Sequence, residues 1–236
     1  MLYFSSELKN YRIDATDGEM GKMQDLYFDD RKWAIRYCIV DTRKWLPGRK
    51  VLLSPASFEH VNELDGLVEV NLDKETIRNS PSINEGEPIT RDTEFTLAGY
   101  YGWSRYWLGN MLWGGQDQPF TPLPDMKAER TVYQDPLHEN NDYELRSEAE
   151  SIGIRAHAND GRLGTVVDFI FDDEYWKIRY LIIEGIDVPA TKLYLIKMEM
   201  IQSVDWLEED LYVDCTTDMF SQEIGYESRK EIMKNL

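Results

Sequence analysis

One sequence pattern occurs twice in this chain. The segment from Asp17 to Ile39 returns without a gap as the segment from Asp160 to Ile182, and the residue numbers differ by 143 at both ends (160 − 17; 182 − 39). Both copies begin with Asp-Gly, carry two adjacent aspartates at the same point and continue with Trp-x-Ile-Arg-Tyr. A fixed internal period of this kind indicates a duplicated structural unit. The sequence therefore predicts two copies of one small domain.

The length of 236 residues leaves room for two such domains. We expect the first repeat in residues 1–82, a linker in residues 83–144, and the second repeat with a C-terminal helix in residues 145–236. Each repeat then has about 80 residues, which is near the lower end for an independent core.

The repeated segments have the pattern of β-strands. In Trp33 to Val40 and in Trp176 to Ile183 the large apolar residues alternate, which builds one apolar face per strand. Asp25 and Asp168 interrupt the preceding apolar run at the same point, and a β-bulge is one explanation. About five or six short strands per copy, with frequent turn signals, favour an all-β fold of two consecutive small antiparallel barrels. Short helices are expected after the barrels, with an irregular linker between them.

The charge of the chain excludes some classes of partner. The 44 acidic and 26 basic residues give a net charge of −18, which repels nucleic-acid phosphates and anionic lipid headgroups. No apolar run reaches the roughly 20 residues of a membrane span, and residues 1–7 lack the pattern of a secretion signal. We expect a cytoplasmic protein that binds no nucleic acid and does not span a membrane.

The two cysteines are interpreted as packing residues. Cys38 aligns with Leu181 of the other copy, and Cys215 aligns with Leu72. Each thiol therefore replaces a leucine, which is typical of a small buried apolar group.

No pattern in the chain predicts catalysis or a cofactor. The three histidines, His60, His138 and His157, have no histidine counterpart in the other copy, and no Gly-x-Ser-x-Gly motif is present. The acidic turns do not have the ligand spacing of an EF-hand. We expect a protein that is not an enzyme and holds no cofactor or metal. The doubling and the acidic turns leave one alternative open, a small-ligand or metal sensor with a site between the two barrels.

Two features outside the barrel pattern are candidate partner contacts. The linker carries an aromatic cluster that is either a docking strip for a partner or ligand, or a cover that folds back on a barrel. A basic loop occurs only in the first repeat, where the second has Gly185 to Thr191, and such asymmetry marks either a partner site or simple loop drift. The candidates are Tyr100, Tyr101, Trp103, Tyr106, Trp107 and Trp113 in the cluster, and Arg43, Trp45 and Arg49 in the loop.

The repeated string closely resembles the PRC-barrel family. The resemblance rests on Asp-Gly-Glu-x-Gly, Asp-x-x-x-Asp-Asp and Trp-x-Ile-Arg-Tyr, continued by Asp41 to Pro55, and it covers about residues 5 to 80 and 145 to 222. It implies a compact β-barrel that acts through protein contacts, without a family-wide catalytic residue. Two members of this family differ from the chain: the reaction-centre H subunit has a membrane-spanning helix before its barrel, and RimM pairs its barrel with a different N-terminal domain, whereas here the barrel is doubled. We therefore expect a non-enzymatic protein-interaction or assembly module, with a protein partner and possible homo-oligomers.

Overall fold

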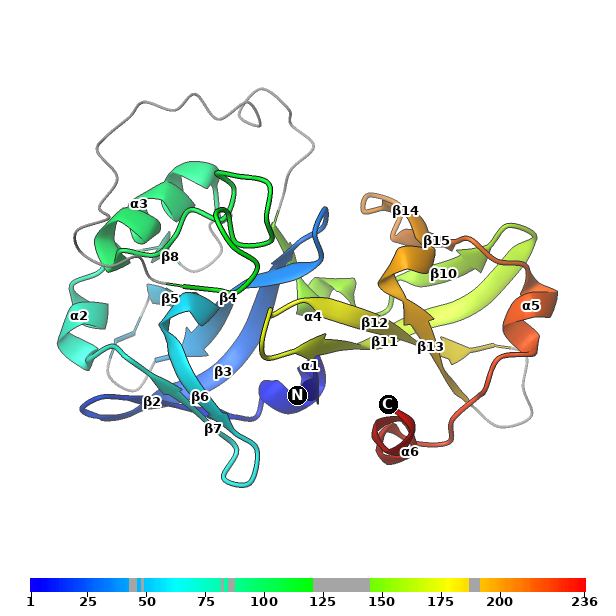
Figure 1. Ribbon diagram of the computed structural model, residues 1–236, viewed down its shortest axis with the longest axis horizontal. Coiled ribbons are helices and arrows are strands. Elements are labelled where there is room, and N and C mark those ends of the chain that lie inside the picture. The colour runs from blue at the N-terminus through cyan, green and yellow to red at the C-terminus, as the bar shows by residue number, and fades with distance from the viewer. Residues whose placement is uncertain (43–45, 48, 82, 85–87, 121–144, 187–191) are drawn as a thin grey trace. The chain divides into compact units, whose positions relative to one another are not determined.

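The computed structural model describes residues 1–236 except 43–45, 48, 82, 85–87, 121–144 and 187–191. The described part is mostly β-structure with short helices, as the all-β prediction requires (Figure 1). The first repeat contains β1 (Leu2–Phe4), α1 (Ser5–Leu8), β2 (Arg12–Ala15), β3 (Gly18–Asp29), β4 (Ala34–Asp41), β5 (Arg49–Leu53), β6 (Phe58–Asn62), β7 (Leu67–Val70), α2 (Lys74–Arg78), β8 (Ile83–Asn84) and α3 (Arg91–Tyr101).

Apart from β8, which has no counterpart among the described strands, the second repeat has the same succession of elements. It contains β9 (Leu145–Ser147), α4 (Glu148–Ser151), β10 (Arg155–Ala158), β11 (Gly161–Asp172), β12 (Ile178–Gly185), β13 (Leu193–Lys197), β14 (Ile201–Asp205), β15 (Asp210–Val213), α5 (Thr217–Ser221) and α6 (Arg229–Asn235). A single 3₁₀ turn precedes the β6–β7 hairpin at Pro55–Ser57 and the β14–β15 hairpin at Met198–Met200. The expected terminal helix over 221–236 is thus a shorter helix, α6, after the separate α5.

Apart from β8, the strands form two sheets with the same order of equivalent strands. In one sheet the order is β6-β7-β2-β3-β4-β5-β8, and in the other it is β13-β12-β11-β10-β15-β14. Neighbours are antiparallel except β2–β7 and β10–β15, which are parallel. Each parallel pair places a hairpin, β6–β7 or β14–β15, beside the first long strand of its repeat.

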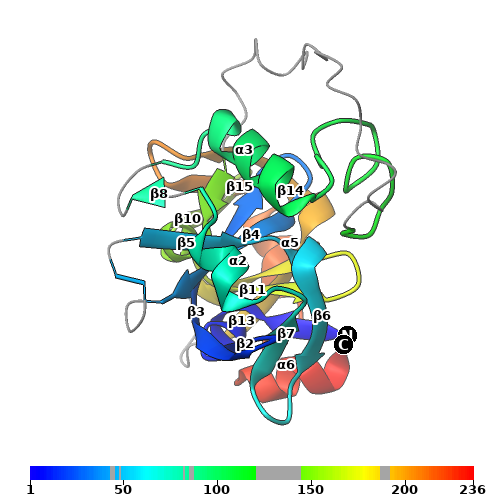
Figure 2. The ribbon, with the colours of Figure 1, turned by 90° about the vertical axis from the view of Figure 1, so that its left-hand side faces the viewer.

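Two compact units contain these sheets. The N-terminal unit consists of Glu7–Ser147 and Asp173–Lys177, and the C-terminal unit consists of Met1–Ser6, Glu148–Asp172 and Ile178–Leu236. Within the N-terminal unit α3 lies over the β5 and β8 side of the sheet, and within the C-terminal unit α6 lies beneath β13 (Figures 1 and 2).

Each unit takes a short strand from the start of the other repeat. β1 pairs with β11 in the register Leu2↔Asp172, and β9 pairs with β3 in the corresponding register Leu145↔Asp29. We call β1 and β9 the exchanged arms. Because the two arms occupy equivalent positions, the duplicated sequence completes both sheets by a reciprocal exchange of strands.

The repeated aspartates hold these arms. The β3–β4 register shifts between Met23 and Asp25, and the β11–β12 register shifts between Val166 and Asp168, so the predicted bulges are confirmed. At each bulge the carboxylate accepts the next backbone N–H, at 2.8 Å for Asp25 and 2.9 Å for Asp168. Asp25 also accepts the hydroxyl of Ser147 from the arm β9, at 2.6 Å.

Asp168 makes the larger set of contacts. It accepts hydroxyl hydrogen bonds from Ser5 and Ser6, which follow the arm β1, at 2.8 and 2.5 Å. Arg229 of α6 places Nε 2.8 Å from the same carboxylate, which is fully buried. A buried charge needs such compensation. Asp168 is therefore a polar residue in an apolar strand because it binds the segment that follows the arm β1.

Two further repeated features follow from backbone geometry. A Cβ at Gly21 or Gly164 would collide with the carbonyl oxygen of Asp41 or Glu184 on the neighbouring strand, so only glycine fits. Trp33 and Trp176 have φ angles of 54° and 55° and belong to the turns. The strands were expected to begin at these tryptophans, but they begin after them, because the left-handed conformation reverses the chain there.

The cores contain both cysteines. Cys38 and Cys215 are buried free thiols, and burial raises the pKa of both. In the C-terminal unit, Phe4 of the arm packs with Ile170, Ile182 and Ile232. The packing interpretation of the cysteines agrees with this burial.

Candidate functional site

The aromatic segment begins with α3. Thr90 caps this helix by accepting the N–H of Thr93 at 3.2 Å, and Gly102 ends it in the left-handed conformation at φ 75°. Residues 104–120 then form a compact loop whose ends are joined by a hydrogen bond from Ser104 N to Phe120 O, at 3.3 Å. We call residues 104–120 the cap loop. The segment predicted as an irregular linker therefore has an ordered first half, whereas residues 121–144 lie outside the described part.

Most of the predicted aromatic contacts are buried. The exposed fraction is 8% or less for Trp103, Tyr106, Trp107 and Trp113, and Tyr101 is half-buried, whereas Tyr100 is 41% exposed. The four buried rings are therefore unavailable as a docking strip, because they already pack against their own unit. Trp103, for example, lies between Tyr101, at a ring distance of 4.3 Å, and Tyr37 of β4, at 6.2 Å.

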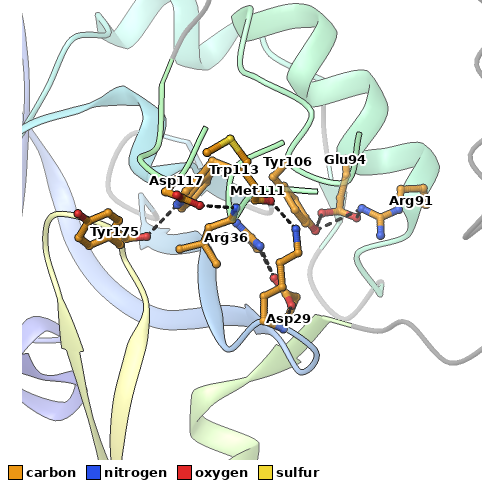
Figure 3. A network of polar contacts seen from close by, with 11 residues as sticks. Asp29, Arg36, Arg91, Glu94, Tyr106, Met111, Trp113, Asp117 and Tyr175 are labelled. Carbon is orange, nitrogen blue, oxygen red and sulfur yellow. Dashed lines mark hydrogen bonds and ion pairs between the residues drawn. The ribbon is translucent and has the colours of Figure 1, made fainter. Parts of the chain in front are cut away.

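The cap loop covers a buried ion pair in the sheet. Arg36 of β4 places Nε 2.6 Å from Oδ2 of Asp29, and both side chains are at most 1% exposed. The guanidinium carbon lies 4.0 Å from the ring centre of Tyr106 and 4.7 Å from that of Trp113, and Figure 3 shows these groups gathered together. Among the described residues Nη1 has no hydrogen-bond partner, so the aromatic faces supply part of its stabilisation.

A second buried charge lies next to this pair. Glu94 of α3 is 1% exposed, receives the hydroxyl hydrogen bond of Tyr106, and pairs with Arg91 at 2.7 Å. Burial raises the pKa of Glu94 to about 7, although Arg91 and the hydroxyls of Tyr106 and Tyr37 lower it. Desolvation thus outweighs the ion pair, and this carboxyl changes its charge near neutral pH.

The cap loop is fastened to the rest of its unit at several points. The indole Nε1 of Trp113 donates to the carbonyl oxygen of Tyr175 at 2.8 Å, and Lys32 Nζ donates to the carbonyl oxygen of Met111. Inside the loop, Gly109 and Gly114 have φ angles of 119° and 88°, which favour glycine. Figure 3 shows how Tyr175, Trp113 and Arg36 follow one another across the covered region. The loop is therefore a fixed part of the surface.

The candidate basic loop is described only in part. Arg43 and Trp45 lie outside the described residues, so their role as partner contacts stays a prediction. Arg49 donates to the carbonyl oxygens of Arg78 and Ser80, at 2.6 Å each. Its guanidinium therefore ties β5 to the end of α2.

The second repeat has the same ion pair with a more exposed arginine. Arg179 places Nε 2.6 Å from Asp172, as Arg36 does from Asp29, but the Arg179 side chain is 37% exposed. The ion pair therefore belongs to the repeated fold, and in the first repeat two rings of the cap loop, those of Tyr106 and Trp113, cover it.

Sequence reasoning missed the buried polar groups of this site. Arg36 is visible in the repeated Trp-x-Ile-Arg-Tyr motif as a charge within an apolar strand, but Glu94 has no such signal in its surroundings. Among the described residues no group of three or more histidine, cysteine, aspartate or glutamate side chains could hold a metal ion. The sensor alternative stays a prediction.

The site is therefore an ordered aromatic loop that lies over two ion pairs with buried carboxylates, Arg36–Asp29 and Arg91–Glu94. Within the described part of the chain, no helix is long and apolar enough to cross a membrane. No protein-family model matches the chain, and no curated protein matches it.

Proposed function

We propose that the chain is a non-enzymatic protein-interaction or assembly module built from two PRC-type barrels. The motif resemblance supports this proposal, as does the identical strand order of the two sheets. The parallel pairs β2–β7 and β10–β15 support the barrel in particular, because they bring the terminal hairpin back to the start of each sheet.

The observation that carries the proposal is the division of the aromatic segment into buried anchors and exposed side chains. Glu94, Leu97 and Ala98 form the buried side of α3. From the same segment Phe95, Tyr100 and Met111 remain 48%, 41% and 44% exposed. The proposed contact surface consists of these three exposed residues.

Rigid presentation of apolar side chains favours binding. Aromatic residues and methionine are enriched in protein interfaces, and a surface that is already ordered loses less conformational entropy when a partner binds. Tyr100 is held by a hydrogen bond from its hydroxyl to the carbonyl oxygen of Thr76, at 2.8 Å. Arg105 lies over the Phe95 ring at 4.1 Å, so this ring also has a defined place.

The exchanged arms support the assembly aspect. Each sheet binds a strand from the start of the other repeat through backbone hydrogen bonds, which is the physical basis of recognition by strand addition. A sheet edge that accepts such a strand can also serve assembly with other chains.

Affinity capture from native lysate tests the proposal. The wild type is compared with a Phe95→Ser, Tyr100→Ser double variant and with a Met219→Ser control, since Met219 is 58% exposed on α5 of the other unit. We expect a partner that the wild type and the control capture and the double variant loses. Equal capture by all three chains would contradict the proposed surface, and light scattering of the same samples checks for homo-oligomers.

A further inference from the structure

A polar cluster in the C-terminal unit surrounds the side chain of His157. It lies on the outer face of the parallel pair β10–β15, where exposed and buried residues alternate. Arg155 places Nε 2.7 Å and Nη2 3.0 Å from the two carboxylate oxygens of Asp210, and His157 places Nε2 2.7 Å from Oδ1. The His157 ring also stacks on the ring of Tyr212, at a centroid distance of 5.5 Å. The imidazole is therefore held at one edge and on one face.

These contacts determine which ring nitrogen carries the proton. Hydrogen bonds from Arg155 and His157 lower the pKa of the Asp210 carboxyl to about 2, so that at neutral pH it is ionised and only accepts hydrogen bonds. Nε2 of His157 must then be the donor. In the neutral imidazole this leaves the lone pair on Nδ1.

Nδ1 of His157 is open to solvent. Within the described part of the chain it has no hydrogen-bond partner, and it is not among the buried polar atoms that lack one. The side chain is 25% exposed. The cluster therefore presents a basic nitrogen in one fixed tautomer.

The fold forms without this cluster. The first repeat has the same parallel pair, β2–β7, in the same register, and it carries no histidine there. Strand pairing therefore does not explain the cluster. With the repeat offset (157 − 14 = 143), the counterparts of His157, Asp210 and Tyr212 are Asp14, Leu67 and Glu69.

A cation lies beside the histidine. Arg162 of β11 is the cross-strand neighbour of His157, and residues in such pairs have Cβ atoms about 4.5–5.5 Å apart. Arg162 is exposed and has no ion pair or hydrogen bond with another described residue. Its counterpart in the first repeat is Glu19, which pairs with Arg12 instead. The second repeat thus has a positive charge next to the histidine where the first has a negative one.

The nearest acidic strand lies on the other side of the cluster. Asp205 of β14 is the cross-strand neighbour of Asp210, and its carboxylate accepts the backbone N–H groups of Leu207 and Glu208, both at 3.1 Å. The strand order β11-β10-β15-β14 places Arg162 and Asp205 on opposite sides of His157. An anionic group on the histidine is therefore accommodated on the β11 side.

The geometry points to Nδ1 of His157 as a phosphoryl-acceptor site. The cluster supplies a nucleophilic nitrogen, a carboxylate that stabilises the ring when it becomes positive, and a cation for the phosphoryl oxygens. An acyl group has no such negative charge for Arg162 to bind. A metal ion needs further ligands, and no group of three or more suitable side chains is present among the described residues. This site is separate from the proposed contact surface, which lies in the N-terminal unit.

The step transfers one phosphoryl group from a donor that carries it on a protonated nitrogen. The Nδ1 lone pair forms the new N–P bond while the P–N bond of the donor breaks, and the neutral amine leaves with the electron pair of that bond. The ring keeps its proton on Nε2 and becomes an imidazolium, which Asp210 stabilises. No proton has to leave the histidine.

The test uses potassium phosphoramidate, a small donor of this class, with the full chain at neutral pH. Peptide mass spectrometry gives the rate of phosphorylation at each histidine, and phosphorus NMR distinguishes Nδ1 from Nε2 as the modified atom. His60, exposed on β6, is the internal reference. The variants are Asp210→Ala, Arg162→Glu and Lys230→Glu, and the last is a charge-matched control at an exposed position of α6.

We expect His157 to react roughly tenfold faster than His60, and at Nδ1 alone. Asp210→Ala should slow the reaction to about the His60 rate and give a mixture of Nδ1 and Nε2 products, because the tautomer is no longer fixed. Arg162→Glu should slow it by about threefold or more, whereas Lys230→Glu should leave it unchanged despite the same change in net charge. Thermal unfolding midpoints establish that each variant is folded.

Four results would overturn the assignment. They are equal rates at His157 and His60, a wild-type product on Nε2, an Asp210→Ala variant with the rate and product of the wild type, and equal effects of Arg162→Glu and Lys230→Glu. None of them bears on the proposed interaction function.

Discussion

Glu94 in α3 and Ile232 in α6 lie at the same distance from the start of their helices. Each is the fourth residue after a hydroxyl-bearing N-cap, Thr90 or Ser228, and each is at most 1% exposed. The second repeat shows that an apolar side chain fills this position. Glu94 therefore places a carboxyl at a buried position where α6 has an apolar side chain. Because burial raises its pKa to about 7, its charge changes near neutral pH.

The stability of the N-terminal unit should fall as the pH rises from about 4.5 to about 7. Since burial raises the pKa of Glu94 from 4.5 to about 7, the folded unit binds this proton more tightly than the unfolded chain. Its contribution is complete below pH 4.5 and is lost above 7, with a total of about 3 kcal/mol. Urea unfolding at pH 5.5 and 8.5 measures the part of this loss that lies above pH 5.5, about 2 kcal/mol.

Two variants isolate this group from the other titrating residues. Glu94→Gln should reduce the pH dependence, because the amide cannot ionise, whereas Glu75→Gln on the exposed side of α2 should retain it. Parallel pH profiles for wild type and Glu94→Gln would show that the buried carboxyl does not titrate in this range.

Arg36→Met should destabilise the N-terminal unit by about 3–5 kcal/mol, because it leaves Asp29 buried without its counter-charge. Arg179→Met is the matched control in the other repeat. Since the Arg179 side chain is 37% exposed, water partly replaces the lost pairing there, and we expect a smaller cost. Chemical denaturation curves give both values, and equal costs would refute the importance of the aromatic cover.

Phe4→Ala should destabilise the C-terminal unit, although the substitution lies at the start of the chain. The ring is 1% exposed and packs with Ile170 and Ile182, so its loss should cost about 3–5 kcal/mol. Hydrogen exchange of the β11 amides measures the effect. Leu145→Ala in the other arm is half-buried and should change protection in β3 less. Unchanged exchange in β11 would contradict the arm exchange.

Trp113→Phe should cost less than Trp113→Ala. Phenylalanine keeps an aromatic face over Arg36 but loses the hydrogen bond from Nε1 to Tyr175 O, which is worth about 1 kcal/mol. Alanine also leaves a cavity, for a total of about 3–5 kcal/mol. Thermal unfolding of both variants, with the exposed Tyr100→Ala as reference, ranks the costs. If the Phe variant is as unstable as the Ala variant, the aromatic face over Arg36 contributes nothing beyond the hydrogen bond to Tyr175.

The repeat made much of the fold predictable. Alternating apolar residues located most strands. Asp25 and Asp168 located the bulges, because an aspartate that interrupts the apolar pattern at the same position of both copies indicates a shared backbone irregularity. The turn residues Trp33 and Trp176 were assigned to strands, since propensity favours aromatic residues in strands and gives no sign of a left-handed backbone.

The arms and the candidate site could not be derived in this way. Backbone pairing between Leu2 and Asp172 connects residues far apart in sequence, and no local pattern specifies it. The aromatic cluster was recognised, but composition does not state which rings point inward. That outcome depends on the buried charges Arg36 and Glu94, which the cap loop covers.

The exchange of arms also determines where the gene can be divided. A fragment that starts at Leu145 contains β9 and most of the C-terminal unit but lacks β1, and one that ends before Leu145 keeps β1 while losing β9. Either half would present an uncovered sheet edge beside an arm with no acceptor in its own unit. Each half expressed alone should give a low yield of folded protein, and co-expression of the two halves should restore it. The two repeats therefore depend on each other for folding.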